Sequence, residues 1–408
     1  MNVRPGRLSR RWPSPRRLDE NVRVTRLLIE DFRNYARAER TIASAVTALV
    51  GRNGAGKTNV LEAIHLIARG DSPRARDDTE LVRWGANTAR VSARVERIDD
   101  ARTVDVVLFS PPAGERRRPR RYLLDGAGKR ADEAIGELAV VSFFPEDVQL
   151  LAEAPSARRR YLDSMVAQVY RRHRSETREY QRILEQRNSL LRALRSDVRP
   201  SALESGSAGA GEAGPGRTME LSFWDAELVR LAASISLRRL EAVRELVAPF
   251  REAATRFSGA DSLSLAYAAQ VEGDTIAERA TAYQALIGQK RDRELWQGTT
   301  LVGPHREDLA VSAHGRALPT FASRGEQRSA VLSLKLAEAA WIRDRVGELP
   351  VFLLDDVLSE LDPGRRDALV DALPEDAQTV LTAAFEAGIP ERLIERADVL
   401  WVKDGAIA

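Results

Sequence analysis

The segment of residues 51–58 constrains this chain more than any other. Its residues are Gly51, Arg52, Asn53, Gly54, Ala55, Gly56, Lys57 and Thr58, which match the phosphate-binding pattern G-x-x-x-x-G-K-[ST] at every fixed position. An apolar run, 46–50, comes directly before it, and an amphipathic helical pattern follows. A glycine-rich loop can match a short pattern by chance, but the order of strand, loop and helix indicates a nucleotide site.

The residue types of this loop suit phosphate binding. Its three glycines let the backbone turn tightly enough for successive N–H groups to point at phosphate oxygens, and the helix that begins near Lys57 adds its positive dipole end. In this pattern the lysine reaches the β and γ phosphates, while the hydroxyl of Thr58 binds Mg²⁺. The sequence therefore predicts a nucleotide bound together with Mg²⁺.

A second signal lies far downstream, where residues 351–356 form an apolar run that ends in Asp355 and Asp356. A buried strand of this kind places its last carboxylates at the sheet edge where open α/β sheets bind ligands. Asp355 is the expected Mg²⁺ partner, and Asp356 could orient or deprotonate the attacking water. Taken alone, the two acids could be a solvated strand end. Together with the phosphate loop, they favour nucleotide hydrolysis.

A third segment, residues 321–328, contains a turn with Ser323, Gly325 and Gln327 just before a helical pattern. Taken alone, the turn is an ordinary helix N-cap. Its position one helix before the Asp-Asp strand, however, resembles the signature motif of ABC-type ATPases, and residues 359–362 match the D-loop of that superfamily. The resemblance implies an ATP-dependent homodimer, because the signature turn closes over the γ-phosphate that the partner subunit holds.

Several further segments narrow the resemblance to one family. They are 31–35, which includes Asn34, then 58–63, 83–85, 144–147, 159–163, 186–188, 298–300, 303–309 and the Ser323 turn. From about residue 22 to the C-terminus, the chain resembles the RecF family of bacterial recombination-repair ATPases. The resemblance implies a head like those of SMC and Rad50 proteins, with ATP and Mg²⁺ as cofactors and Asn34 at the nucleotide.

The family resemblance also implies a cellular role. It predicts sequence-independent binding to double-stranded DNA and gapped junctions, and cooperation with RecR and RecO in loading RecA at single-strand gaps, the RecFOR pathway. The chain departs from the wider superfamily after the D-loop strand, where 378–384 contains no histidine and Thr382 is the substitute. Asp356 replaces the usual catalytic glutamate and is one methylene shorter, so we expect a weak, DNA-dependent ATPase. A Q-loop glutamine is also missing, and Glu146 occupies the corresponding region.

The predicted fold class is α/β, a P-loop ABC-type ATPase head built from both chain ends with an inserted helical lobe. The predicted parts are a disordered basic tail (1–21), the N-terminal head (22–148), the helical lobe (149–297) and the C-terminal head (298–408). Apolar residues spaced by alternating steps of four and three between Val166 and Leu194 predict a short antiparallel arm in the lobe. We expect this arm to break at Pro200 and a flexible linker to occupy 198–218.

Composition excludes several classes of protein. The 408 residues contain no cysteine, which rules out disulfides and thiolate chemistry, and the four histidines lack the spacing of zinc ligands. No apolar run approaches the ~18 residues of a membrane span, and residues 1–20 lack the apolar core of a secretory signal. The sequence therefore predicts a cytoplasmic protein without a membrane segment.

Basic residues gather in clusters although the net charge is only +3. One cluster, in a predicted hairpin turn, contains Arg116, Arg117, Arg118, Arg120 and Arg121. Such runs are usually solvated surface. With the family resemblance, we expect them to contact DNA phosphates and so to bind many sequences alike, with an affinity that falls as salt rises.

Two other function classes compete with a DNA-binding ATPase. An ABC transporter subunit would have its signature turn much closer to the phosphate loop than Ser323 is to Thr58. A structural tether of the SMC or Rad50 type would need far longer coiled-coil arms than the about four heptads seen here. Salt-sensitive, ATP-dependent retention on DNA would separate the favoured function from transport.

Overall fold

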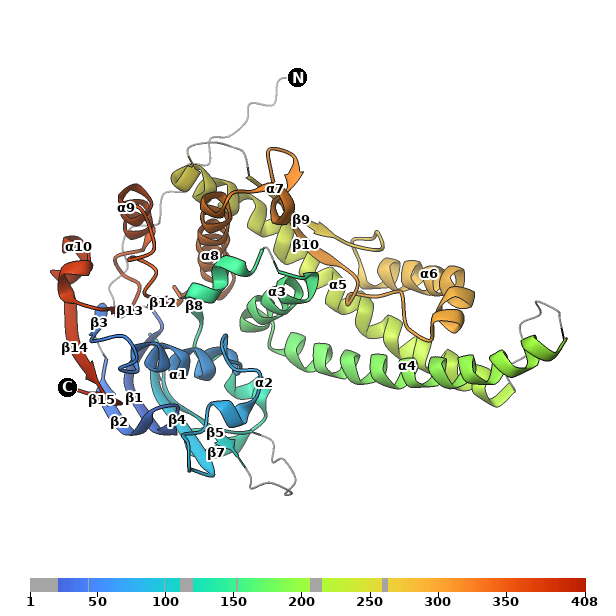
Figure 1. The fold of residues 1–408 in the computed structure, drawn as a ribbon, viewed down its shortest axis with the longest axis horizontal. Coiled ribbons are helices and arrows are strands. Elements are labelled where there is room, and N and C mark those ends of the chain that lie inside the picture. Colours follow the sequence, from blue (N-terminus) through green and yellow to red (C-terminus); the bar gives the residue numbers. More distant parts are fainter. Residues whose placement is uncertain are drawn as a thin grey trace. The chain divides into compact units, whose positions relative to one another are not determined.

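The computed structural model describes residues 21–42, 44–98, 100–110, 120–151, 153–205, 215–258 and 263–408. They form two compact units (Figure 1). The first comprises the chain up to Asp147 together with Leu332–Ala408, and the second is Val148–Val331. The phosphate loop and the Asp-Asp strand belong to the first unit, and the Ser323 turn belongs to the second.

A mainly parallel sheet carries the phosphate loop in the first unit. Its order is β15 (Ala406–Ile407), β14 (Ala397–Lys403), β3 (Val46–Val50), β13 (Thr379–Ala383), β12 (Val351–Asp355) and β8 (Val140–Phe143). Only β15 runs antiparallel to its neighbour. Every residue of β3, β12 and β13 is buried, as expected for strands covered on both faces. The α/β head built from both chain ends is thereby confirmed.

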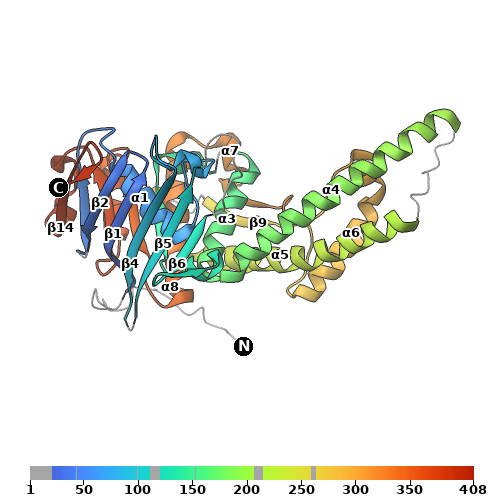
Figure 2. The ribbon, with the colours of Figure 1, turned by 90° about the horizontal axis from the view of Figure 1, so that it is seen from below.

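An antiparallel sheet forms the second layer of this unit (Figure 2). Its order is β2 (Tyr35–Thr41), β1 (Arg23–Phe32), β4 (Thr88–Glu96), β5 (Ala101–Phe109), β6 (Arg121–Leu124) and β7 (Ala127–Lys129). Helix α1 (Lys57–Arg69) buries nearly its whole surface in one apolar core with residues from both sheets. The remaining elements are η2 (Asp78–Glu80), α2 (Ala131–Ala134), η3 (Pro145–Gln149), α9 (Pro363–Ala372), η4 (Glu386–Gly388) and α10 (Glu391–Ile394).

Long helices dominate the second unit. Its elements are α3 (Pro155–Val169), α4 (Arg171–Ser205), α5 (Pro215–Ser258), β9 (Leu263–Ala268), α6 (Ile276–Gln297), β10 (Asp308–Ala313), β11 (Arg316–Ala317) and α7 (Leu318–Phe321). Helix α8 (Arg324–Val346) begins in this unit and ends in the first. Helices α4 and α5 lie side by side, with α6 against α5 (Figure 1). None of the helices in the described residues is long and apolar enough to cross a membrane.

The predicted return to the head at residue 298 is wrong, since the second unit continues to Val331. The reason is strand pairing: β10 pairs antiparallel with β9 over six residue pairs, and this pairing keeps β10 with the helices. Glu307 adds a buried anchor. Its carboxylate accepts hydrogen bonds from Ser236 Oγ at 2.8 Å and from Tyr283 OH at 2.6 Å, on α5 and α6.

The predicted arm also needs correction. It consists of two helices, α3 and α4, separated at Tyr170, and α4 runs through Pro200 to Ser205. A proline removes one backbone N–H, but the remaining bonds and packing of a long helix can outweigh that loss. The predicted linker 198–218 is therefore helical at both edges, and 206–214 lie outside the described residues.

The predicted tail 1–21 is one residue too long. Asn21 is buried, and its side-chain oxygen accepts from the Leu349 N–H at 3.1 Å, within the first unit. The rest of the predicted tail, 1–20, lies outside the described residues.

Arg187, a polar residue on the apolar stripe of α4, is the centre of a buried ion-pair cluster. Arg187 is fully buried, and its guanidinium donates to Asp225 at 2.8 Å and to Glu294 at 2.6 Å. It thereby links α4 to α5 and α6. Because removal of one partner would leave an uncompensated buried charge, these pairs fix how the helices pack.

His305 is a half-buried histidine of the second unit that is neutral at neutral pH. Its Nδ1 lies 2.6 Å from Tyr180 OH and its Nε2 lies 3.2 Å from the Thr300 carbonyl oxygen. Because a carbonyl can only accept, Nε2 carries the proton and Nδ1 accepts from the tyrosine. Burial and, to a smaller extent, nearby arginines lower the pKa of His305 from 6.5 to about 4, while the hydrogen bond to the Thr300 carbonyl acts in the opposite direction.

This lowered pKa predicts a loss of stability in mild acid. Between pH 6.5 and about 4, the unfolded chain binds a proton at His305 that the folded chain does not. The free energy of unfolding should thus fall by as much as about 1.4 kcal/mol for each pH unit as the pH drops through this window. Urea unfolding at several pH values measures this slope. His305→Asn should flatten it, whereas the exposed control His314→Asn should not; an unchanged slope in His305→Asn would contradict the assignment.

Candidate nucleotide site

The phosphate loop requires a glycine at position 56. Gly56 has φ 115°, and a Cβ atom there would lie 2.7 Å from Asn34 Nδ2. Helix α1 begins at the next residue, and no side chain caps its first turn. The first N–H groups of α1 are therefore available to an anion, as a phosphate site requires.

Lys57 lies across the loop. Its Nζ donates to the carbonyl oxygens of Gly51 at 2.6 Å and Arg52 at 3.1 Å. Burial lowers the pKa of Lys57, and the charges of Asp356 and Asp355 act in the opposite direction. The ammonium group is therefore held at the loop and shares a local field with both acids of the Asp-Asp strand.

Asp355 is the centre of the site. Its Oδ1 accepts from Thr58 Oγ1 at 2.9 Å and from Thr382 Oγ1 at 2.8 Å. Burial raises the pKa of Asp355, and these two hydrogen bonds oppose that rise. Three segments distant in sequence, the start of α1, the end of β12 and strand β13, thus meet at one carboxylate.

This arrangement fits Mg²⁺. The ion is bound in phosphate sites by one or two carboxylates together with phosphate oxygens and waters, and a hydroxyl beside a carboxylate supplies that donor set. The described residues contain no cluster of three or more His, Cys, Asp or Glu that could hold a metal. The hydroxyl of Thr58 beside the carboxylate of Asp355 suits a metal shared with a nucleotide.

Asp356 has an unusual backbone for a non-glycine residue, with φ 50°. Its N–H donates to Thr382 Oγ1 at 2.9 Å, and Ser359 Oγ donates to its Oδ1 at 2.7 Å. Thr382 therefore orients both acids at once. A backbone held in this region is typical of functional sites, and here the neighbouring hydroxyls hold it.

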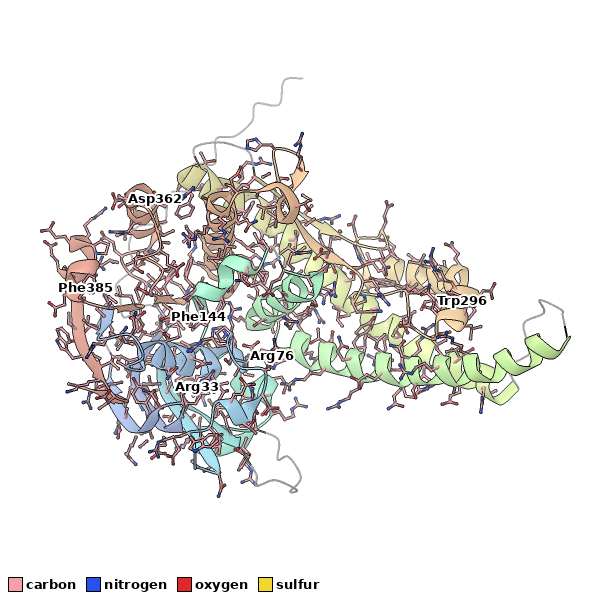
Figure 3. The ribbon with its side chains drawn as sticks, in the orientation of Figure 1. Arg33, Arg76, Phe144, Trp296, Asp362 and Phe385 are labelled. Atoms are coloured by element: carbon pink, nitrogen blue, oxygen red, sulfur yellow. The ribbon has the colours of Figure 1, made fainter. Side chains whose placement is uncertain are left out.

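The most important residue that the sequence analysis missed is Arg33, labelled in Figure 3. Its guanidinium makes a two-point contact with the fully buried Glu62 of α1, with Nε–Oε2 and Nη2–Oε1 distances of 2.8 and 2.7 Å. The pair ties the β1–β2 turn to the helix that follows the phosphate loop. The segment 31–35 is part of the family resemblance, but the sequence cannot show which of its residues pairs with α1.

A second missed group lies beside Asp355. Arg74 is 3.7 Å from the carboxylates of both Glu62 and Glu146, and the charge of Arg74 lowers the pKa of Asp355 while that of Glu146 raises it. Glu146 therefore stands close enough to influence the site. Its predicted Q-loop role stays a prediction.

Asn34 lies behind the phosphate loop. Its Nδ2 donates to the Ala55 carbonyl at 3.0 Å, and its Oδ1 accepts from Asn59 Nδ2 at 2.8 Å. Both ends of the amide are thus engaged in holding the loop. A direct contact of Asn34 with the nucleotide stays a prediction.

The Ser323 turn in the second unit forms a capping box. Ser323 Oγ accepts from the Glu326 N–H at 3.2 Å, and the Glu326 carboxylate accepts from the Ser323 N–H at 2.8 Å. Glu326, rather than Gln327, is thus the residue that pairs with Ser323 in the capping box. The side chain of Gln327 instead donates through Nε2 to the Ala322 carbonyl at 3.2 Å. Ser323 is exposed, and Gly325 lies in the first turn of α8. Whether Ser323, Gly325 and Gln327 reach a partner's phosphate stays a prediction.

The arginine cluster is only partly described. Arg116, Arg117 and Arg118 lie outside the described residues. Arg120 donates to Asp78 at 2.6 Å and also to the Gly70 carbonyl, so its charge is used inside the head. Arg121 is exposed, with its guanidinium 5.5 Å from the centroid of the Phe109 ring. The DNA contact of Arg121 stays a prediction. We no longer expect one for Arg120, because Asp78 and the Gly70 carbonyl already engage its guanidinium.

Comparison with known proteins identifies the family of this chain. The model of the RecF/RecN/SMC N-terminal domain family matches residues 23–402. A protein described as "DNA replication and repair protein RecF" from Roseiflexus castenholzii is 39% identical over 400 residues, which cover 94% of this chain and 98% of the relative. One of the same description from Geobacillus kaustophilus is 33% identical over 390 residues, 94% of this chain and 98% of the relative. The chain belongs to the RecF family.

A solved structure of a RecF protein shows how closely this RecF-family chain keeps the fold. The structure, named "Structure of the recombination mediator protein RecF-ATPrS in RecFOR pathway", superposes with a TM-score of 0.80 and 25% identity over 95% of this chain and 98% of that one. The head of an Smc protein from Pyrococcus yayanosii, at 12% identity and a TM-score of 0.51 over 95% of this chain and 96% of that one, shares the fold alone. The RecF-family fold is thus an SMC-type ABC ATPase head, as predicted.

Thr382 provides a test of the site in this RecF-family protein. Thr382→Val removes the hydroxyl that donates to Asp355 and accepts from the Asp356 N–H, so we expect the free energy of unfolding to fall by about 1–3 kcal/mol. Thr47→Val is the matched control, because Thr47 is buried in the neighbouring strand β3 and its hydroxyl has no hydrogen-bond partner among the described residues. Urea unfolding measures both. Equal losses in the two variants would show that Thr382 does not organise the acids.

Proposed function

We propose that this protein is an ATP-dependent DNA-binding protein that dimerises on ATP, hydrolyses it slowly and acts in the repair of single-strand gaps. The observation that carries the proposal is the hydrogen bond of 2.9 Å between Thr58 and Asp355, which joins the phosphate loop to the Asp-Asp strand across 297 positions of sequence. The ATP-bound state named for a solved RecF relative supports ATP as the nucleotide.

The residues of the head divide the work of nucleotide binding. Backbone N–H groups of Gly56 and α1 would bind phosphate oxygens, and Lys57 would exchange its loop carbonyls for the β and γ phosphates. Thr58 and Asp355 would hold Mg²⁺, which neutralises charge on the phosphates. Lys57 and the buried Asp355 already lie at the loop, where Lys57 donates to two loop carbonyls and Asp355 accepts from Thr58. Nucleotide binding therefore needs only small movements of these two side chains.

Hydrolysis by this site should be slow. Asp356 is the carboxylate that we propose to orient the attacking water, and its contacts with Ser359 and Thr382 keep it in place. Thr382 stands where relatives in the superfamily carry a histidine, and its hydroxyl is already engaged by Asp355. The short side chain of Asp356 limits its reach toward a water, so a long-lived ATP state suits a clamp better than a motor.

We extend the proposal to DNA and the repair partners. The relatives described as DNA replication and repair proteins, and the solved structure named for the RecFOR pathway, support a part in DNA repair within that pathway. We propose in addition that the protein works with RecR and RecO to load RecA at gapped DNA in the cytoplasm. Phosphate contacts from exposed arginines such as Arg121 would make binding independent of sequence and sensitive to salt.

Dimerisation would complete the site. The exposed Ser323 turn caps α8 in the second unit, and we propose that it closes over the γ-phosphate held by another copy of the chain. Each of the two composite sites would then contain the phosphate loop of one subunit and the signature turn of the other.

The helical unit argues against the two alternative functions. A long helical insertion between phosphate loop and signature turn does not suit a transporter ATPase subunit. A tether needs arms of hundreds of residues, but α4 has 35 residues and α5 has 44. At 1.5 Å per residue they reach only about 50 and 65 Å.

Retention on DNA tests the function directly. Lys57→Ala should abolish ATP binding and ATP-dependent DNA retention, because it removes the ammonium aimed at the β and γ phosphates. Asp356→Asn should still bind ATP but lower turnover by roughly 10²-fold or more, since the water loses its base, and should prolong retention. Nucleotide titration, phosphate release and DNA retention at two salt concentrations measure these effects. Normal ATP binding by Lys57→Ala would refute the site, and retention insensitive to ATP and salt would refute the clamp.

A mixing experiment tests the composite dimer. Ser323→Arg should leave ATP binding by the monomer near normal, because the phosphate loop is untouched, but should block ATP-dependent dimerisation and turnover by bulk and misplaced charge. Mixed with Lys57→Ala, it should regain part of the activity, since one heterodimer site combines an intact loop with an intact turn. Sedimentation and phosphate release measure the outcome. Parental dimerisation and turnover by Ser323→Arg would show that the turn is only an N-cap.

A further inference from the structure

The chain ends in a tight hairpin that touches the phosphate loop. Strands β14 and β15 are joined by a two-residue turn, Asp404-Gly405, with φ values of 48° and 75°. Positive φ at both central positions is the type I′ pattern that Asp-Gly favours. The turn lies just beyond the region matched by the family model, which ends at residue 402.

Two contacts place this hairpin against the phosphate loop. The Gly405 N–H donates to the Ala55 carbonyl oxygen at 3.1 Å, at the tip of the loop. At the start of the loop, the Val402 carbonyl oxygen lies 2.2 Å from the position that a Cβ atom on Gly51 would take. The hairpin therefore holds the loop at Ala55 and lies close to its backbone at Gly51.

These contacts set the direction of the loop N–H groups. Because a trans peptide is planar, its C=O and N–H bonds point in opposite directions. The Ala55 carbonyl is held outward by Gly405 N–H and by Asn34 Nδ2 at 3.0 Å, so the N–H of Gly56 must point to the other side. Tyr35 OH donates to the Gly56 carbonyl at 3.1 Å and orients the next N–H, that of Lys57, in the same way.

We propose that Gly405 is a positioning residue for ATP binding, which holds the Ala55–Gly56 peptide so that the Gly56 N–H faces the phosphates. This inference rests on the proposed function. Gly405 acts through the loop and touches no reacting atom. Gly405 lies outside the phosphate loop, in the β14–β15 hairpin, and positions the loop from there.

The position accepts only glycine for two reasons. Its φ of 75° is strained for other residues, and a Cβ atom would lie 2.4 Å from the Asn34 carbonyl oxygen. The hairpin cannot easily retreat, because Val402 and Ile407 are buried in the core and the Ala408 N–H donates to the Trp401 carbonyl at 2.7 Å. A side chain at 405 should therefore displace the turn from Ala55.

The head contains a matched control for this substitution. Asp125-Gly126 joins β6 to β7 by a turn of the same type, with φ values of 52° and 79°. No atom lies within 4 Å of a Cβ placed on Gly126. Gly405→Ala and Gly126→Ala thus strain the same kind of Asp-Gly turn, but only the first disturbs the phosphate loop.

The experiment compares ATP affinity in the full-length variants. Isothermal titration with ATP and Mg²⁺ should show about tenfold weaker binding or more for Gly405→Ala, because an oriented N–H donor to a charged group is lost. Gly126→Ala should stay within about twofold of the parent. Hydrogen exchange without nucleotide should become faster in the 51–58 segment of Gly405→Ala alone, a change that simple loss of stability would not confine to this loop.

The possible outcomes distinguish the positioning role of Gly405 from the proposed ATP-binding function. A parent that does not bind ATP would refute the proposed function. A parent that binds ATP, with Gly405→Ala equal to it or Gly126→Ala equally impaired, would refute the positioning role alone. If Gly405→Ala does not fold, Gly405→Asn against Gly126→Asn carries the same comparison, since asparagine tolerates positive φ while its Cβ still meets Asn34; equal affinities in that pair would also refute the role.

Discussion

The buried carboxylate of Asp355 is the point on which the head depends. It accepts hydrogen bonds from Thr58 and Thr382, which follow or belong to strands β3 and β13 on either side of the sheet's centre. Its desolvation is tolerable only because both hydroxyls point at it. The phosphate loop, the proposed metal ligand Asp355 and the proposed water-orienting acid Asp356 therefore share one local network, so a change in any one hydroxyl alters the others.

Short-range patterns made much of this site predictable. The phosphate loop, the Asp-Asp strand and the turn at Ser323 each have a fixed spacing that one segment contains, so each can be identified from its own stretch of sequence. The partners of the ion pairs could not be predicted from the sequence. Arg33 pairs with Glu62 and Arg187 with Glu294, and no local pattern marks residues that are so far apart in the sequence. The predicted boundary at residue 298 was wrong for the same reason, since the observed boundary at residue 331 depends on which strand β10 pairs with.

The two units also differ in how they use polar residues. In the first, buried polar groups converge on the loop and its acids, where a ligand can use them. In the second, Arg187 pairs with carboxylates of α5 and α6, and Glu307 accepts from hydroxyls of the same two helices. These buried charges of the second unit therefore fix helix packing, whereas Asp355 of the first lies at the phosphate loop.

The strand order of the head has a consequence for how the chain acquires its shape. Strand β3 lies between β13 and β14, which come from the far end of the chain, so β3 has no neighbour until nearly the whole protein has been made. Pairings of such long range are slow to form and leave apolar strands exposed in the meantime. The second unit, whose residues are contiguous, can fold during that wait. A long insertion between the two halves of the head therefore need not stay unfolded while the head is still incomplete.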